Sequence, residues 1–321
     1  MKEVKLPKIV VILGPTASGK TDLGLELAKK FNGEIVSADS RQVYKKMNIG
    51  TAKPKGVWEK INGNKIFVVD NIPHYLVDIV DPGDDFTVAD YKKMATLKIN
   101  DILSRGKLPI MVGGTGLYIW TLLDNLDIPK IKPSQRLRKG LEKKSLPELV
   151  AFLKKIDLET AQRIDLHNPR RVLRALEVFI LSGESLARQI TKSASLFNAL
   201  QIGIDLPRAE LYERIDARVD QQIKNGLVEE TKKLIKQKYD WNLPSMSGIG
   251  YKQIGFYLRG EATLDEAIAI LKRDTRHYVK RQMTWFKRDK KINWIKTPDP
   301  KLVEGLVKKF LTKAGFISHK V

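Results

Sequence analysis

The sequence predicts an α/β protein in which a doubly wound, mainly parallel sheet carries an inserted small helical domain. Short β-branched apolar runs alternate with amphipathic, helix-like segments, which is the pattern of βαβ units around a parallel sheet. A glycine-rich stretch, GPTASGKT at 14–21, lies between the first apolar run and a helix-like segment. A strand, such a turn and a helix make a phosphate-binding P-loop. Residues 124–197 contain helix-like segments and no convincing strand, so we expect them to form the insertion.

Each expected element follows from its own pattern. The apolar runs expected as strands are 8–13, 34–39, 108–114, 199–206 and 291–297. In the insertion, Asn168 and Pro169 are suited to an N-cap and a first helical position. We therefore expect a first part of the P-loop core over 1–123, the helical insertion over 124–197, and a second part of the core, with a basic C-terminal helix, over 198–321.

The composition excludes several classes of protein. Hydrophobic residues make up 42% of the 321-residue chain, enough to fill a core, and there is no cysteine. Disulfides, thiolate zinc sites and cysteine nucleophiles are therefore excluded. No apolar run approaches the roughly 20 residues that cross a bilayer, and the N-terminal stretch lacks the cleavage site of a signal peptide. We expect a cytoplasmic protein with no membrane partner; its four histidines show no metal-ligand spacing.

The formal net charge is +21, and the surplus of basic residues grows toward the C-terminal part of the chain. Residues 201–321 carry 25 basic and 15 acidic side chains. Two interpretations stay open on composition alone. The charge can serve solubility in general, or it can be the electrostatic footprint of a polyanionic partner.

The stretch at 14–21 is a candidate site for phosphate. Its glycines permit close approach of the backbone, and successive N–H groups form an anion nest. Lys20 would reach the terminal phosphate, and the Thr21 hydroxyl would ligate Mg²⁺. The residues expected to bind the phosphorylated ligand are Gly14, Pro15, Thr16, Ala17, Ser18, Gly19, Lys20 and Thr21. The alternative is a tight turn without a ligand.

Three further features are ambiguous by themselves. Asp39 ends the second apolar run, where a carboxylate can act as a general base toward an acceptor, or can merely cap the next segment together with Ser40. Thr115 and three glycines end the third run in VGGTGLY, which indicates close approach to a ligand or a simple turn. Arg214 and Arg218 share one helix face and form either a solvated pair or a phosphate clamp.

The stretch 272–291 has nine basic and two acidic residues and predicts a helix with two unlike faces. The basic face consists of Arg273, Arg276, His277, Lys280, Arg281, Thr284 and Arg288, and the opposite face of Leu271, Thr275, Tyr278, Gln282, Trp285 and Phe286. We expect the helix to dock by its aromatic side. Its basic stripe then contacts a phosphate backbone or forms a solvated surface.

Eight blocks in one order resemble the tRNA dimethylallyltransferases (tRNA isopentenyltransferases) over nearly the whole chain. The blocks are GPTASGKT, DSRQVYKKMNIGTAKP, HYLVDIVDP, FTVADY, VGGTGLY, NPRRVLRALEVF, GIGYKQ and TRHYVKRQMTWF. Two positions depart from the family pattern: Tyr75 stands where many members have a second histidine, and Gly248 where many have alanine. The zinc finger of the eukaryotic relatives is absent, as the lack of cysteine requires.

The resemblance implies that the P-loop holds the diphosphate of dimethylallyl diphosphate. The five-carbon group would pass to the exocyclic amine of the adenosine 3′-adjacent to a tRNA anticodon. Lys20, Mg²⁺ on Thr21, and Arg218 would neutralise the departing diphosphate. Asp39 would take the proton of the acceptor amine, and Thr115 would lie beside the diphosphate and the target base.

The resemblance also implies where the RNA binds, with the target base splayed out of the anticodon loop. Asp39, Ser40, Arg41, Gln42 and Thr115 would line the base pocket. The remaining implied RNA contacts are Arg136, Arg170, Arg171, Val172, Leu173, Arg174, Gly248, Ile249, Gly250, Tyr251, Lys252, Arg276, Lys280 and Arg281. The insertion would grip the anticodon stem-loop, and we expect a monomer.

Three rival functions differ in testable ways. A small-molecule kinase would share the P-loop and Asp39 but would consume ATP and needs no basic stripe. An RNA-binding GTPase-like switch should carry an Asn/Thr-Lys-x-Asp motif, and the sequence has none. An adenylate isopentenyltransferase would use a free nucleotide, whereas the blocks implied in RNA contact favour a polynucleotide. The tRNAs modified, the preferred prenyl donor, and whether ATP also enters the P-loop stay open.

Overall fold

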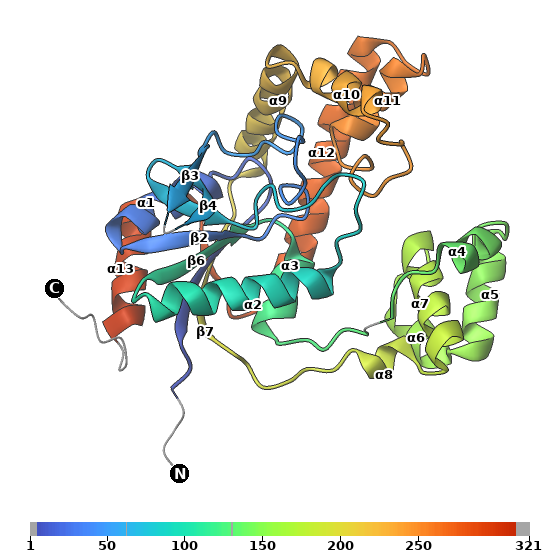
Figure 1. The fold of residues 1–321 in the computed structure, drawn as a ribbon, viewed down its shortest axis with the longest axis horizontal. Coiled ribbons are helices and arrows are strands. Elements are labelled where there is room, and N and C mark those ends of the chain that lie inside the picture. The colour runs from blue at the N-terminus through green and yellow to red at the C-terminus, as the bar shows by residue number, and fades with distance from the viewer. Residues whose placement is uncertain (1–4, 62, 130, 313–321) are drawn as a thin grey trace. The chain divides into compact units, whose positions relative to one another are not determined.

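The structure is a computed structural model that describes residues 5–61, 63–129 and 131–312 (Figure 1). The chain forms two compact units. The core unit contains the described residues up to Leu122 and from Leu196 onward, and the helical unit covers Leu123–Ser195. The helical unit thus interrupts the core unit in sequence, where the sequence predicts an insertion over 124–197.

The core unit is built on a sheet with the strand order β3-β4-β5-β2-β6-β1-β7-β8. The strands are β1 (Lys8–Leu13), β2 (Gly33–Ser37), β3 (Val57–Ile61), β4 (Asn64–Val69), β5 (Ile72–Tyr75), β6 (Leu108–Gly113), β7 (Asn198–Ile204) and β8 (Asn293–Ile295). From β5 to β8 all neighbours pair in parallel, while β3, β4 and β5 form an antiparallel meander at one edge. The predicted fold class is confirmed.

Burial on both faces explains why the central strands read as apolar runs. All six residues of β1 and all six of β6 are buried. Val10, Ile12 and Ile110 belong to the hydrophobic cluster that also contains α1 side chains, and their alternating neighbours point to the opposite face because side chains alternate along a strand. These two layers make the sheet doubly wound.

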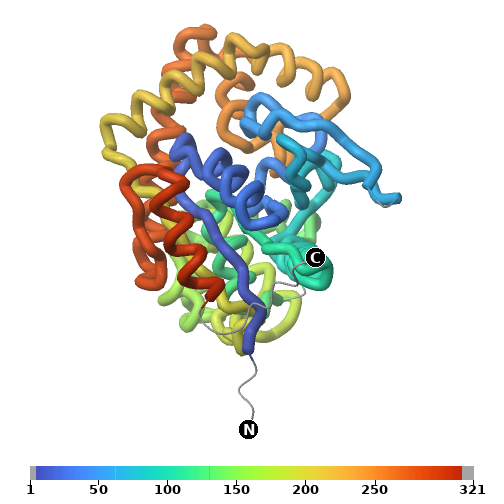
Figure 2. The backbone as a smooth tube through the Cα atoms, turned by 90° about the vertical axis from the view of Figure 1, so that its left-hand side faces the viewer, coloured from blue at the N-terminus to red at the C-terminus, as the bar shows by residue number. Residues whose placement is uncertain are grey.

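Helices of the core unit cover both faces of the sheet. They are α1 (Lys20–Lys30), α2 (Val88–Ser104), α3 (Gly116–Leu123), α9 (Arg208–Lys224), α10 (Leu227–Lys236), α11 (Tyr251–Leu258), α12 (Leu264–Phe286) and α13 (Pro300–Thr312). α13 packs beside α1 (Figure 2) and also contacts β7. α2 covers the other face, where the Tyr91 hydroxyl donates a hydrogen bond to the Ser37 carbonyl at 3.1 Å.

The antiparallel meander at the sheet edge was not predicted from the sequence. Its outer strand β3, VWEKI, is almost entirely exposed, so no buried apolar face leaves a periodic signal. β5 supplies only four residues to the sheet, IPHY, and pairs with β2 through Ile35 and His74. Tyr75 at its end donates a hydrogen bond to buried Glu34 at 2.8 Å. The tyrosine that departs from the family pattern is thus hydrogen-bonded to a buried residue of the core unit.

The helical unit has its own small core. Its helices are α4 (Gln135–Leu141), α5 (Leu146–Ile156), α6 (Leu158–Arg163), α7 (Pro169–Ser182) and α8 (Leu186–Gln189). α7 begins as the sequence predicts, because the Asn168 side chain accepts hydrogen bonds from the Arg170 and Arg171 amides. Leu153, Val172 and Leu176 are fully buried between these helices.

In the described ranges, no helix is both long and apolar enough to span a membrane.

Candidate active site at the P-loop

The loop between β1 and α1 has the backbone shape of an anion nest. Ala17 (φ 65°) and Gly19 (φ 83°) adopt the left-handed region, which turns successive N–H groups toward one side. A Cβ on Gly19 would also lie 3.1 Å from the Pro298 ring. The buried Ser18 hydroxyl has no hydrogen-bond partner among the described residues. The loop therefore offers backbone N–H donors to an anion.

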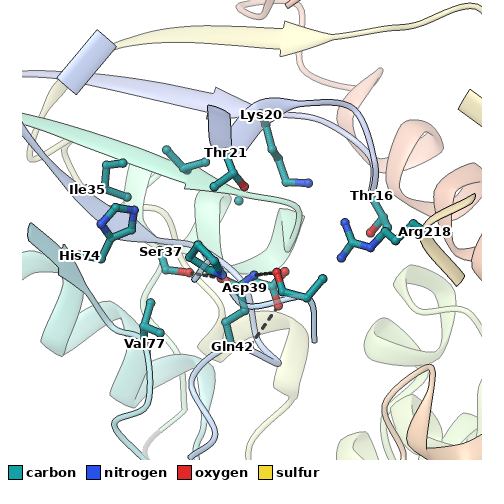
Figure 3. A pocket seen from close by; sticks show the side chains of 14 residues that line it. Thr16, Lys20, Thr21, Ile35, Ser37, Asp39, Gln42, His74, Val77 and Arg218 are labelled. Atoms are coloured by element: carbon teal, nitrogen blue, oxygen red, sulfur yellow. Dashed lines mark hydrogen bonds between the residues drawn. The ribbon is translucent and has the colours of Figure 1, made fainter. Parts of the chain in front are cut away.

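Two cationic side chains reach the pocket in front of this loop (Figure 3). The Lys20 ammonium donates a hydrogen bond to the Pro15 carbonyl at 3.1 Å. Burial and the nearby Arg218 guanidinium lower the pKa of Lys20 to about 8, and Asp39 partly offsets this. Arg218 of α9 makes no hydrogen bond or ion pair within the part of the chain that the structure describes, and burial lowers its pKa. Two such cations define a site for an anion.

Asp39 faces the same pocket from the end of β2 (Figure 3). Its Oδ1 atom accepts hydrogen bonds from the Arg41 amide at 2.8 Å and from the Gln42 amide at 3.4 Å. The carboxylate therefore caps the turn that follows β2 while it faces the two cations. Both interpretations of Asp39, the cap and the site residue, are compatible with this geometry.

Thr115 does not line this pocket but is tied to it through the loop after β2. Its hydroxyl accepts a hydrogen bond from the Ser40 amide at 3.0 Å and donates one to the Ser40 hydroxyl at 3.3 Å. Tyr278 of α12 is the next neighbour, and burial together with the Asp39 charge raises the pKa of Tyr278 to about 12. The strand ends of β2 and β6 are thus joined beside the pocket.

The three glycines of VGGTG make room for protein neighbours. A Cβ on Gly113 would lie 2.2 Å from the Ala38 carbonyl oxygen, one on Gly114 2.4 Å from Gln282 Nε2, and one on Gly116 2.2 Å from the Trp285 ring. Two of the three contacts come from α12. Because these glycines have no side chains, α12 can pack against the end of β6.

Gln282 is a site residue that the sequence did not single out. Its Oε1 accepts a hydrogen bond from the Thr16 amide at 3.0 Å, and its Nε2 donates one to the Gly114 carbonyl at 2.8 Å. One buried amide therefore fixes the P-loop to the end of β6. The only signal in the sequence was a polar residue on the expected docking face of the helix.

A second long-range contact holds the loop that borders the pocket at Ala52 and Pro54. The Glu230 carboxylate accepts hydrogen bonds from the amides of Asn48, Ile49 and Gly50 at 3.0–3.1 Å, and from the Tyr251 hydroxyl at 2.6 Å. A Cβ on Gly50 would lie 2.5 Å from the Tyr251 ring. α10 and α11 thus anchor this wall of the pocket.

Several of the expected RNA contacts are accessible. On the core unit, the side chains of Lys252, Lys280 and Arg281 are exposed, and Arg41 is half-buried with a hydrogen bond to the Pro244 carbonyl at 2.5 Å. Ile249 is also partly exposed. On the helical unit, the exposed basic residues are Arg136, Arg170 and Arg171, and Leu173 is partly exposed.

Other expected RNA contacts have structural roles that occupy their side chains. Val172 and Tyr251 are buried. Arg174 pairs with the buried Glu177 at 2.6 Å, and Arg276 forms an ion pair with Asp216 of α9. Gly248 and Gly250 are buried glycines beside α11. The side chains of Val172, Arg174, Tyr251 and Arg276 are thus engaged in packing or ion pairs, and their expected RNA contacts stay a prediction.

Arg214 behaves differently from Arg218. It pairs with Glu210 at 2.7 Å on the exposed side of α9 and does not line the pocket. Arg218, one helical turn further along α9, does line the pocket.

The fold and the site together define a class. This is a P-loop α/β protein whose nest, two poorly compensated cations and carboxylate suit the transfer of a group from a phosphorylated donor. Comparison with known proteins narrows the class. A family model described as IPP transferase matches residues 42–289, and one described as isopentenyl transferase matches residues 7–72. The chain belongs to the tRNA dimethylallyltransferase family.

The bacterial relatives match along nearly their full length. The tRNA dimethylallyltransferase of Acetivibrio thermocellus is 45% identical over 94% of this chain and 96% of its own. The solved full-length tRNA isopentenylpyrophosphate transferase of Bacillus halodurans is 38% identical, with a TM-score of 0.69 over 95% of this chain and 96% of that one. A eukaryotic dimethylallyltransferase acting on tRNA is 26% identical, with a TM-score of 0.71 over 96% and 76%.

Proposed function

We propose that the protein transfers the dimethylallyl group of dimethylallyl diphosphate to the exocyclic amine of the adenosine 3′-adjacent to the anticodon in tRNA. The products are isopentenyladenosine and diphosphate. The family membership supports tRNA prenylation. The observation that carries the residue assignment is the pair of poorly compensated cations, Lys20 and Arg218, facing Asp39 in one pocket.

The P-loop holds the donor by its diphosphate. The nest amides donate hydrogen bonds to phosphate oxygens, and Lys20 and Arg218 supply positive charge. When the allylic C–O bond breaks, its electron pair leaves with the diphosphate, and the two cations stabilise the charge that develops there. Because both are already in position, little reorganisation is needed at that step.

The acceptor side uses Asp39. The amine lone pair forms the new C–N bond to the allylic carbon, and the amine proton passes to the carboxylate. The hydrogen bonds from the Arg41 and Gln42 amides fix the carboxylate through Oδ1. Thr115 holds Ser40 beside it and so positions the loop that the base would approach.

We also propose that Mg²⁺ accompanies the donor. Thr21 lines the same pocket and offers a hydroxyl oxygen, which is a hard ligand, and Mg²⁺ commonly takes few protein ligands beside substrate phosphates and water. No group of three or more acidic or histidine side chains suited to a metal occurs among the described residues, so the diphosphate would complete the coordination. The ion would supply further charge stabilisation to the leaving group.

The RNA would lie against exposed cations of both units. Lys252, Lys280 and Arg281 belong to the core unit, and Arg136, Arg170 and Arg171 to the helical unit. Because all the side chains of the mechanism come from one chain, we propose a monomer. A tRNA substrate also supports our expectation of a cytoplasmic protein.

The test uses unmodified tRNA with a donor labelled in its prenyl group, and a parallel reaction with γ-labelled ATP. We expect label to enter the RNA from dimethylallyl diphosphate, with diphosphate released in equal amount only when RNA is present. Transfer from ATP to any acceptor, or release of diphosphate that is independent of RNA, would contradict the proposal.

A further inference from the structure

The loop 48–54 forms one wall of the donor pocket and has an unusual backbone. Ala52 and Pro54 of this loop line the pocket. Ala52 adopts φ 45°, in the left-handed region that residues with a side chain rarely occupy. Such a conformation persists only where the surrounding structure fixes it. The contacts that hold this loop therefore set the shape of the pocket wall.

Glu230 of α10 binds the start of the loop through its backbone. The carboxylate accepts hydrogen bonds from three consecutive amides, those of Asn48, Ile49 and Gly50, at 3.0–3.1 Å. The Tyr251 hydroxyl donates a fourth at 2.6 Å. Burial and the Glu230 charge raise the pKa of Tyr251, so this hydroxyl keeps its proton. Four donors thus converge on one charged acceptor, and hydrogen bonds of this kind are strong.

The end of the same loop is hydrogen-bonded to the residues around Asp39. The Gln42 Nε2 atom donates hydrogen bonds to the Thr51 carbonyl at 3.4 Å and to the Ala52 carbonyl at 3.3 Å. The Gln42 amide donates one to Asp39 Oδ1 at 3.4 Å. Both Gln42 and Asp39 line the donor pocket (Figure 3). A chain of contacts therefore leads from Glu230 through the loop to the Asp39 carboxylate.

We propose that Glu230 is a positioning residue for the transfer reaction, because it fixes the loop 48–54 and through that loop Gln42 and Asp39. The inference rests on the proposed function, in which Asp39 takes the proton of the acceptor amine. Glu230 does not line the pocket itself, so it acts through the loop. In the proposed function other residues hold the diphosphate and the RNA. We therefore expect the loss of Glu230 to slow the chemical step more than it weakens the binding of either substrate.

The experiment measures the single-turnover rate at saturating donor and tRNA, and the Kd of each substrate, in Glu230→Gln. Glutamine has the same shape, but it has one acceptor oxygen and brings N–H donors toward the loop amides. Tyr251→Phe is a milder variant that removes only one of the four hydrogen bonds. Glu229→Gln is the matched control, because Glu229 precedes Glu230 on α10, is exposed and pairs with Lys232 at 3.2 Å.

We expect a loss of rate that depends on Asp39. A displacement of about 1 Å caused far from the chemistry can cost roughly 100-fold, so the rate should fall about 10–100-fold in Glu230→Gln. The loss should be smaller in Tyr251→Phe and absent in Glu229→Gln, with little change in either Kd. In an Asp39→Asn background, Glu230→Gln should cost less than about threefold, because residues that act as a unit are not additive.

The outcomes separate this inference from the proposed function. If the parent protein does not prenylate tRNA, the proposed function fails. If the parent is active but Glu230→Gln lowers only the Tm, or lowers the rate by the same factor with and without Asp39, then Glu230 has a structural role and the inference is wrong. Should Glu230→Gln fail to fold, Tyr251→Phe decides, and a rate equal to that of the parent overturns the inference.

Discussion

Lys20 illustrates how the environment of a single residue couples charge to ligand binding. Its pKa is lowered to about 8 by burial and by Arg218, so the free protein carries a lysine that is partly neutral in mildly alkaline solution. A bound diphosphate is an anion and must raise that pKa again. The protonated form therefore binds the donor more tightly, and binding takes up a proton above pH 8.

Because protonated Lys20 binds the donor more tightly, we predict that donor binding in the absence of RNA weakens at high pH. The Kd should be nearly constant below about pH 7.5 and should rise toward tenfold per pH unit above about pH 8. Calorimetric titration at several pH values measures it. Lys20→Ala should bind weakly at every pH and lose this dependence. A parent Kd that stays flat up to pH 9.5 would show that Lys20 does not meet the diphosphate.

Asp39 has two roles that one substitution separates. Asp39→Asn keeps an Oδ1 atom that can accept from the Arg41 and Gln42 amides, and asparagine serves as well as aspartate in such caps. It cannot take a proton. We expect the single-turnover rate at saturating tRNA to fall by about 10²–10⁴-fold, with little change in donor affinity. A loss below threefold would leave the carboxylate as a cap only.

At the level of single residues, the sequence predicted the site residues that lie close together in the chain. It missed residues that meet only in the folded structure. The P-loop residues follow one another in the chain, so their spacing alone identified them. Spacing alone did not distinguish Arg218 from Arg214, because only the packing of α9 decides which of them enters the pocket; Arg218 was singled out by the family resemblance. Gln282 meets Thr16, and Glu230 meets Asn48, across more than 180 residues. No pattern within one segment contains such a pair.

α12 is the element that joins the expected RNA surface to the donor site. Its buried face and its cap, in which the Thr263 hydroxyl accepts from the Glu266 amide, fix the helix in the core unit. Gln282 on that face binds the P-loop, and Lys280 and Arg281 nearby are exposed. The sequence predicted the two faces of this helix, but Arg276 turns to Asp216 of α9 instead of to solvent.

We expect substitutions of Gln282 to act on donor binding. Gln282→Met has a similar length but leaves the Thr16 amide and the Gly114 carbonyl unpaired, at a cost of about 1–3 kcal/mol each. The Kd for dimethylallyl diphosphate should rise about tenfold or more. Gln282→Glu keeps the acceptor but adds a negative charge beside the diphosphate, so it should bind the donor more weakly still. A lowered Tm with an unchanged Kd in both variants would reduce Gln282 to a packing role.

The exposed cations of α12 should act through phosphate charge. Replacing Lys280 and Arg281 by alanine should weaken tRNA binding and flatten the dependence of log K on log salt by about 0.7–0.9 per lost contact. Filter binding at four salt concentrations measures the slope. Lys308 and Lys309, exposed on α13, form a matched control that should leave it unchanged. An identical slope in both double variants would make the α12 stripe a solvated surface.

For the whole molecule, the sequence was informative where burial is two-sided. Each of the five apolar runs expected as strands lies in the parallel part of the sheet. The central strands are continuous apolar segments because they are covered on both faces, whereas the edge strand β8 is only partly buried. The antiparallel edge lacked that signal, since β3 is exposed and β5 has four residues. The helical unit was recognisable by its helix-like segments and by the Asn168 cap. Its buried Glu177, which pairs with Arg138 and Arg174, shows why not every arginine there is free for RNA.

In the proposed function, this molecule moves a prenyl group from the P-loop pocket to one amine in the anticodon loop. The most direct measurement maps the labelled nucleoside after reaction with labelled dimethylallyl diphosphate and two tRNA transcripts. One has adenosine 3′-adjacent to the anticodon, and the other has guanosine there. We predict label on that adenosine in the first transcript and none in the second. Equal labelling of both transcripts, or label at another position, would show that the protein does not prenylate this adenosine specifically.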